Sequence, residues 1–293
     1  LEGATKVAVR FLDDVIDVSR FPLAAQRQEA LNKRRLGLGV TGLADAIVMC
    51  GLIYGSAEAA EIAAQMARTI RDAALEASAD LAAEKGAFPL FDAAQFLATP
   101  YAMRLSDGQR QMISSRGLRN GLLTSIAPTG TISLLAGNVS SGIEPVFSAS
   151  QDRRIVNADG SHRVERLYDY ALSRWRTMGN AVSRPPGFVT VGDLTPSQHL
   201  AMAAAIQPFV DSSISKTINV AKNIGFEDFV HVYREAYELG LKGCTTFRPN
   251  DVTGSVLTQA EDAQDHCPSC QGIHLIRKEG CTTCLDCGFA LCG

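Results

Sequence analysis

An apolar run at residues 122–126 (LLTSI) leads directly into a polar, glycine-containing loop at residues 127–133 (APTGTIS). The run has the length and composition of a buried β-strand, and the loop carries the signals of a turn followed by a helix. A junction of this kind gathers backbone N–H groups and the positive end of a helix dipole at one point, where an anion can bind. The sequence therefore predicts an α/β fold with a candidate anion site after this strand.

Hydroxyl groups and a glycine make this loop suitable for phosphate. We expect the helix to begin at Thr131 and the glycine to let a ligand approach the backbone. The loop matches neither the Walker pattern nor the dinucleotide-binding glycine fingerprint, so a capped turn without a ligand is an equally good interpretation of the spacing. The residues of the loop that could contact a phosphate are Thr129, Gly130, Thr131 and Ser133.

A second polar loop follows at residues 138–147 and contains one carboxylate, Glu144. Beside a phosphate site, a carboxylate can contact a sugar or ligate a metal ion. It can equally form an ion pair that only holds the loop in place. The sequence leaves these alternatives open.

Helical and β-prone segments alternate on both sides of the junction. Strands separated by helices indicate a parallel sheet or barrel that helices cover. Three glycines within residues 34–44 (RRLGLGVTGLA) indicate a tight turn or a close approach between backbones. The expected helices cover residues 1–20, 56–85, 195–205 and 226–239, another begins at Leu43, and the expected strands cover residues 122–126, 213–220 and 242–247.

The composition is that of an ordinary globular protein. Of its 293 residues, 46% are hydrophobic and 20% are charged, and the formal net charge is −3. This balance disfavours a broad nucleic-acid-binding surface. No apolar stretch is long enough to cross a bilayer, and the N-terminus has no secretory leader pattern, so we expect a cytoplasmic protein that binds no membrane. The start at Leu1, inside a helical pattern and without an initiator Met, indicates a fragment.

The cysteines divide the chain, because six of the eight fall in the last 27 residues. Two C-x2-C knuckles, Cys267/Cys270 and Cys281/Cys284, are separated by ten residues and can close a tetrahedral zinc site. A segment this short needs the metal in order to fold. Replacing Cys281 by Cys287 gives a second set with an equally good spacing, and the spacing does not separate the two sets.

The tail ends with a C-x4-C pair, Cys287 and Cys292. Accessible thiols on a flexible segment suit thiol–disulfide exchange. The competing interpretation is a zinc ribbon with two additional structural cysteines. Cys50 and Cys244 stand alone, and we expect both to be small buried thiols.

Five motifs occur in a characteristic order along the chain. They are RRLGLGVTGLAD at residues 34–45, APTGTIS at 127–133, SGIEP at 141–145, SISKTINV at 213–220 and KGCTTFR at 242–248. In order and spacing they resemble the C-terminal half of the catalytic chain of ribonucleotide reductases. The resemblance implies half of a ten-stranded α/β barrel at residues 1–250, a linker at 251–266 and a cysteine-rich, zinc-ribbon-like tail at 267–293.

The resemblance also implies how the substrate is held. In that family the loop corresponding to residues 127–133 binds the substrate phosphates, which assigns this role to Pro128, Thr129, Gly130, Thr131 and Ser133. The family's finger loop, Asn-Pro-Cys followed closely by Glu, carries the radical cysteine and the general base, and it is absent from this sequence. We therefore expect this piece alone to be inactive.

One departure from the metal-dependent classes indicates the cofactor. Those classes relay the radical through adjacent tyrosines, where this sequence has Cys244-Thr245-Thr246-Phe247. In this respect the chain resembles the adenosylcobalamin-dependent class, class II, in which homolysis of a cobalt–carbon bond makes the radical. The resemblance thus implies adenosylcobalamin as the cofactor of the complete enzyme and names no cobalamin contacts.

Taken together, the resemblance implies a ribonucleoside-diphosphate reductase that forms 2'-deoxyribonucleotides by thiyl-radical chemistry. Cys287 and Cys292 would re-reduce the active site and pass the disulfide to thioredoxin or a glutaredoxin-like protein. A homodimer is compatible with the resemblance, which leaves the effectors and the choice between diphosphate and triphosphate substrates open. The alternative is a non-enzymatic phosphate-binding α/β domain joined to a zinc-ribbon interaction module. In both cases the expected zinc ligands are Cys267, Cys270, Cys281 and Cys284.

Overall fold

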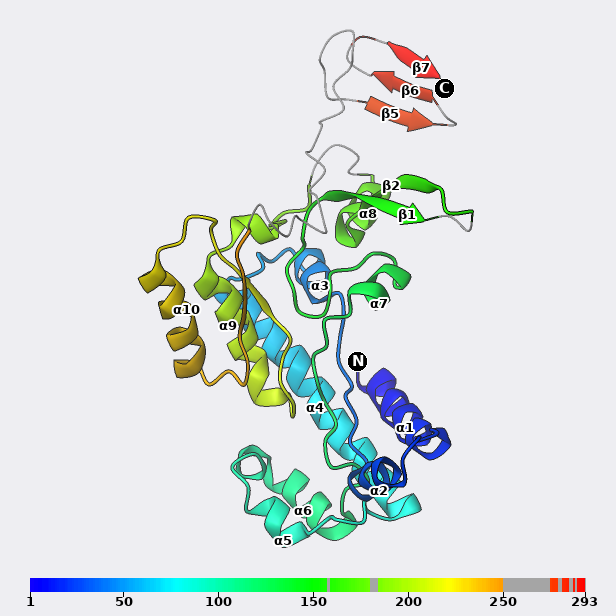
Figure 1. The fold of residues 1–293 in the computed structure, drawn as a ribbon, viewed down its shortest axis with the longest axis vertical. Helices are drawn as coiled ribbons and strands as arrows, with labels where there is room; N and C mark the ends of the chain where they lie inside the picture. Colours follow the sequence, from blue (N-terminus) through cyan, green and yellow to red (C-terminus); the bar gives the residue numbers. More distant parts are fainter. Residues whose placement is uncertain are drawn as a thin grey trace.

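The computed structural model describes residues 1–156, 159–179, 184–249, 275–278, 281–284, 287 and 289–292 (Figure 1). None of the helices in these ranges is long and apolar enough to span a bilayer. The helices are α1 (Glu2–Val18), α2 (Ala24–Lys33), α3 (Leu43–Met49), α4 (Ala57–Lys85), α5 (Ala93–Leu97), α6 (Asp107–Arg116), α7 (Gly130–Leu135), α8 (Tyr170–Thr177), α9 (Pro196–Ile206) and α10 (Phe226–Glu238). The strands are β1 (Ser150–Val156), β2 (His162–Tyr168), β3 (Thr217–Asn219), β4 (Thr245–Phe247), β5 (Leu275–Lys278), β6 (Cys281–Cys284) and β7 (Ala290–Cys292).

Four parallel segments lie side by side in the same order as in the sequence. Leu38 pairs with Thr124, Ile126 pairs with Ile214, and β3 pairs with β4, each in the parallel sense. Every connection between neighbouring segments contains helices. Parallel connections of this kind bring the carboxyl ends of the strands to one edge, where ligands bind in α/β folds. The predicted α/β class is confirmed.

Helix α4 is the longest element and lies between α1 and α9 (Figure 1). The Ser56 hydroxyl caps its first turn by accepting from the Ala59 N–H at 3.1 Å, and the chain leaves the helix at Gly86, where φ is +86°. Alanines line its buried face, and their small side chains let neighbouring helices approach closely. The expected helix at residues 56–85 is confirmed.

The other predicted helices also follow their local signals. At the start of α9, Thr195 and Gln198 form the expected reciprocal capping box. Helix α10 ends shortly before Gly240, whose φ is +74°. Helix α7 begins at Gly130, one residue earlier than expected, because Thr129 takes the left-handed conformation and serves as its N-cap.

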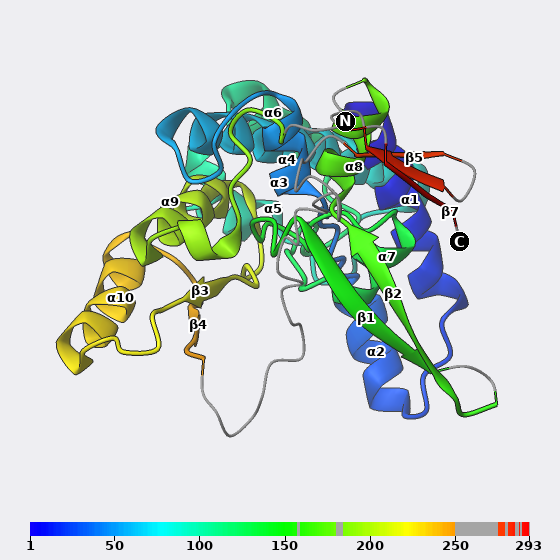
Figure 2. The same ribbon diagram turned by 90° about the horizontal axis from the view of Figure 1, so that it is seen from above.

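The antiparallel hairpin of β1 and β2 was missed by the sequence analysis. It pairs Ser150 with Tyr168 and Val156 with His162, and it extends from the helical body (Figure 2). Its strands, SQDRRIV and HRVERLY, are rich in charged residues and lack the alternation of apolar and polar residues that marks a half-buried strand.

A buried charge network joins α1 to the segment that precedes the parallel core. Asp13 is fully buried, and its Oδ1 lies 2.8 Å from Arg34 Nη2. The same oxygen accepts from Asn120 Nδ2 at 2.9 Å, and Asp13 Oδ2 accepts from Arg119 Nε at 3.3 Å. Arg34 takes the left-handed conformation, with φ +44°. The carboxylate thus accepts from two segments that are distant from it in sequence, one at Arg34 and one at Arg119 and Asn120.

Two thiols depart from the expectation of burial. Cys50 is exposed, so its prediction was wrong: it is the C-cap residue that directly follows α3. Cys244 is half-buried against the apolar cluster that contains Leu200 and Ile218.

The tail contains a small antiparallel sheet of β5, β6 and β7. Its register pairs Cys284 with Leu275 and Cys281 with Cys292. Cys287 is exposed. Cys267, Cys270 and the predicted linker at residues 251–266 lie outside the described residues.

Candidate functional site

A cavity of about 740 Å³ opens where the parallel strands end. Its lining includes Gly130 and Thr131 of the predicted loop and Glu144 of the second polar loop. Asn219 and Phe247, the last residues of β3 and β4, also line it. The two loops that the sequence marks as candidates therefore share one cavity at the edge of the sheet where ligands of α/β folds bind.

The first turn of α7 presents backbone donors at this cavity. Ser133 is the first residue of the turn whose N–H reaches an acceptor in the preceding turn, donating to Thr129 O at 2.8 Å. The N–H groups of Gly130, Thr131 and Ile132 precede it and are not used by the helix. A Cβ atom at Gly130 would meet nothing within 4 Å, so the space on the side-chain side of this residue is open.

The three hydroxyls of the loop have different surroundings. Thr131 and Ser133 both line the cavity, but Thr131 is exposed and Ser133 is buried, while Thr129 is partly buried and does not line it. Thr129 Oγ1 accepts from the Gly142 N–H at 2.7 Å and lies 3.1 Å from Ser133 Oγ. Thr129 and Ser133 therefore hold the loop in shape, and Thr131 offers its hydroxyl to the cavity.

Thr41 completes this hydroxyl cluster and was missed by the sequence analysis. Its Oγ1 lies 2.6 Å from Ser133 Oγ and 3.1 Å from Thr129 Oγ1, and it donates to Ser140 O at 2.9 Å. One side chain thus joins the glycine-rich segment to both polar loops.

The glycines at residues 37–42 explain how Thr41 reaches the loop. A Cβ at Gly39 would lie 2.3 Å from Ser125 O, so only glycine allows this backbone to pass the neighbouring strand so closely. Gly42 has φ +78°, a conformation that side chains disfavour. The close approach predicted from the three glycines is confirmed, and it is the signal that could have pointed to Thr41.

Glu144 is ion-paired to a buried lysine. Lys216 Nζ donates to Glu144 Oε2 at 2.5 Å, and the Thr217 N–H donates to Glu144 Oε1 at 2.6 Å. Lys216 Nζ also lies 2.9 Å from His199 Nδ1. Burial lowers the pKa of Lys216, and Glu144 opposes this shift. Burial, followed by the charge of Lys216, lowers the pKa of His199 to about 3, so the imidazole is neutral.

A pair of buried carboxyl groups supports the cavity wall. Asp45 accepts from the Ser140 N–H at 2.6 Å and from the Ala171 N–H at 2.8 Å. Asp169, which lines the cavity, caps α8 by accepting from the Leu172 N–H at 3.1 Å. Burial, followed by the charge of Asp45, raises the pKa of Asp169 to about 7.

This pair predicts a pH-dependent stability. The pKa of Asp169 is about 7 in the folded chain, against an ordinary value of 3.8. Between these two pH values the folded chain keeps the proton on Asp169, whereas the unfolded chain loses it. The stability that this proton contributes is therefore lost progressively as the pH rises to about 7. We expect the free energy of unfolding of wild type to fall by about 2 kcal/mol more than that of Asp169→Asn between about pH 5 and pH 8. Urea unfolding at both pH values measures this difference. Parallel pH profiles for the two proteins would contradict the assignment.

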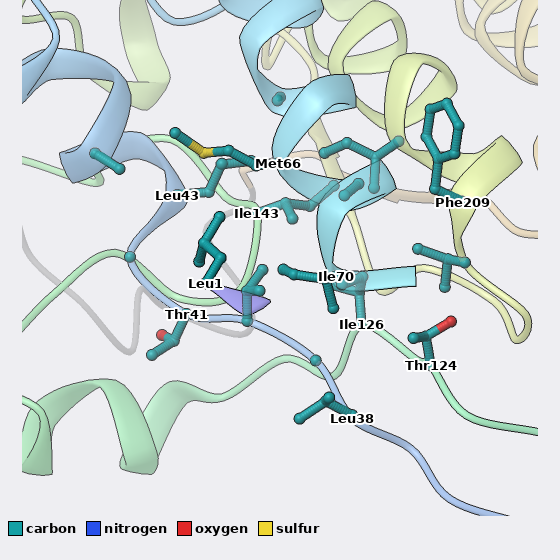
Figure 3. Close-up of a pocket in the computed structure, with 18 residues that line it drawn as sticks. Leu1, Leu38, Thr41, Leu43, Met66, Ile70, Thr124, Ile126, Ile143 and Phe209 are labelled. Carbon is teal, nitrogen blue, oxygen red and sulfur yellow. The ribbon is translucent and has the colours of Figure 1, made fainter. Parts of the chain in front are cut away.

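A second cavity, of about 150 Å³, lies in the apolar interior (Figure 3). Leu43, Met66, Ile126 and Ile143 line it, and Thr41 belongs to its wall as well. Its lining is almost entirely apolar, which does not suit a charged ligand. The larger cavity is therefore the candidate site.

Comparison with known proteins identifies the family. The family model for the ribonucleotide reductase barrel domain matches residues 1–247. The chain belongs to this family. The resemblance inferred from the five motifs is confirmed, and the cysteine-rich tail falls outside the matched region.

The similar ribonucleotide reductases include B12-dependent enzymes. A vitamin B12-dependent ribonucleoside-diphosphate reductase of Mycobacterium tuberculosis (strain CDC 1551 / Oshkosh) is 37% identical over 280 residues, which cover 89% of this chain and 38% of that protein. An enzyme of the same description from Thermoplasma acidophilum is 34% identical over 268 residues, covering 86% of this chain and 33% of that protein. A ribonucleoside-diphosphate reductase large subunit of Caenorhabditis elegans is 29% identical over 250 residues, which cover 76% of this chain and 32% of that protein. The chain thus spans about a third of the length of these relatives.

Proposed function

We propose that the chain is the C-terminal part of an adenosylcobalamin-dependent ribonucleoside-diphosphate reductase and that it binds the substrate phosphates. The observation that carries this proposal is the open first turn of α7 at the wall of the 740 Å³ cavity. The similarity to B12-dependent reductases over 89% of the chain supports the reaction class and the cofactor.

The phosphates bind to the N–H groups of Gly130, Thr131 and Ile132 and to the Thr131 hydroxyl. No Lys or Arg is among the described residues that line this cavity, so backbone dipoles supply the positive potential. Thr129 and Ser133 support the loop through their hydrogen bonds with Thr41. Pro128 precedes Thr129, which takes the left-handed conformation. The five residues of the predicted phosphate loop therefore divide into direct donors and supporting residues.

Substitution of Gly130 tests the phosphate site. Gly130→Val is expected to weaken binding of a ribonucleoside diphosphate by about tenfold or more, because the branched side chain fills the space that the phosphate needs and an unmet phosphate contact is costly. Folding should be retained, since Gly130 lies in a helix and its Cβ would meet no neighbour.

Isothermal titration calorimetry on the complete chain measures this effect. Gly108→Val is the matched control, because Gly108 also lies in a helical first turn with open space around it and does not line the cavity. Equal affinities for wild type and Gly130→Val would refute the phosphate site.

The remaining parts of the reaction belong to the complete enzyme. Adenosylcobalamin would supply the radical when bound to the complete enzyme. In the tail, we assign zinc to Cys267, Cys270, Cys281 and Cys284, and we assign re-reduction by thioredoxin or a glutaredoxin-like protein to Cys287 and Cys292. We place this cycle in the cytoplasm, where such reductants keep thiols reduced.

A further inference from the structure

Glu144 is the only carboxylate besides Asp169 among the described residues that line the cavity. Its side chain is 22% exposed, whereas its partner Lys216 is 2% exposed. Of the two charged groups, the Glu144 carboxylate is therefore the one that reaches the cavity, and the Lys216 ammonium is buried behind it.

All three protons of the Lys216 ammonium have acceptors. They point to Glu144 Oε2 at 2.5 Å, His199 Nδ1 at 2.9 Å and Thr217 O at 2.7 Å. The Thr217 N–H fixes the second carboxylate oxygen at 2.6 Å. With both oxygens held, the carboxylate has a defined orientation, and each oxygen keeps a lone pair for another donor.

The charge balance indicates which ligand group this carboxylate accepts. Lys216 neutralises Glu144, so the pair does not recruit a metal cation, and a carboxylate repels phosphate. A neutral donor such as a sugar hydroxyl suits this carboxylate, and it gains from the ionised acceptor. A nucleotide carries phosphates at one end and hydroxyl donors on the adjoining sugar, and both wall features belong to one cavity.

We propose that Glu144 accepts a hydrogen bond from a sugar hydroxyl of the nucleotide whose phosphates bind at residues 130–132, and that Lys216 is the positioning residue for its carboxylate. The proposal rests on the proposed function, because it uses the same bound nucleotide. It adds a contact that distinguishes sugars, whereas the backbone donors of α7 recognise only phosphate.

Ligand analogues test this contact in the complete chain. We compare the affinities of cytidine diphosphate, its 2'-deoxy and 3'-deoxy analogues and inorganic pyrophosphate for wild type, Glu144→Gln and Lys216→Met. Wild type should bind cytidine diphosphate about tenfold or more tightly than the deoxy analogue that lacks the hydroxyl contacted by Glu144. This ratio corresponds to the free energy of a hydrogen bond to a charged group. Both variants should lose that preference and keep the wild-type affinity for pyrophosphate.

The ratio of two affinities on one variant does not depend on how much of that variant folds, so a partly unfolded sample still gives an answer. Glu227→Gln, on the exposed first turn of α10, is the matched control and should keep the preference. Two results would overturn the inference: a preference for cytidine diphosphate over that deoxy analogue that survives in Glu144→Gln, or no such preference in wild type. The proposed function would still hold in either case if wild type binds nucleotide and Gly130→Val binds it more weakly. Absence of any nucleotide or pyrophosphate binding to wild type would overturn the proposed function and this inference with it.

Discussion

Asp13→Ala is expected to lower the free energy of unfolding by about 3 kcal/mol, the lower end of the cost of removing one partner from a buried ion pair. Asp13 is fully buried, and its loss leaves Arg34, which is 4% exposed, without its most buried partner. Arg34 keeps Asp17, at 2.7 Å from Nη1, and this remaining contact limits the loss. The Asn120 amide also loses the acceptor at 2.9 Å.

Equilibrium unfolding in urea measures this effect. Asp14→Ala is the matched control on the same helix: Asp14 pairs with Lys85 at 2.5 Å, but its side chain is 52% exposed. Exposed pairs of this kind contribute about 0–1 kcal/mol. Equal stability losses for Asp13→Ala and Asp14→Ala would show that the buried network does not join α1 to the core.

Cys292→Ser in the complete enzyme is expected to abolish turnover supported by thioredoxin. The variant should keep turnover with a small dithiol that reduces the active site directly. The substitution removes only the thiolate that the tail needs for thiol–disulfide exchange with the active site and with thioredoxin, which we call the relay. Steady-state deoxyribonucleotide formation with each reductant measures both effects. Loss of activity with both reductants would contradict the relay.

Cys281→Ser is the matched control in the same sheet, since β6 and β7 pair Cys281 with Cys292. It should lose bound zinc, whereas Cys292→Ser should retain it, as measured by metal analysis of the purified proteins. Zinc loss in Cys292→Ser, with Cys281→Ser unaffected, would reverse the assignment of the two cysteines.

The elements whose signals are local were predictable from the sequence. The Ser56 cap and Gly86 define α4, and the Thr195–Gln198 box defines the start of α9. These interactions join residues three or four positions apart, so the pattern carries them completely. The hairpin of β1 and β2 lacks such a local pattern, since its charged strands contact each other up to 18 positions apart.

The candidate site was predictable only in part. The loop at residues 127–133 could be located, since a strand and a turn mark it, but the sequence does not show which hydroxyls face a ligand. Thr41 contacts Thr129 across 88 positions, and Lys216 contacts Glu144 across 72. Such contacts exist only once the parallel segments are assembled, so neither Thr41 nor Lys216 could be assigned a partner beforehand.

A crystal structure of the complete chain with a bound ribonucleoside diphosphate tests the central claim most directly. We expect phosphate oxygens within hydrogen-bond distance of the N–H groups of Gly130, Thr131 and Ile132, in the helical turn whose residues Gly130 and Thr131 line the 740 Å³ cavity. Phosphates bound elsewhere, with these three N–H groups facing only water, would contradict it.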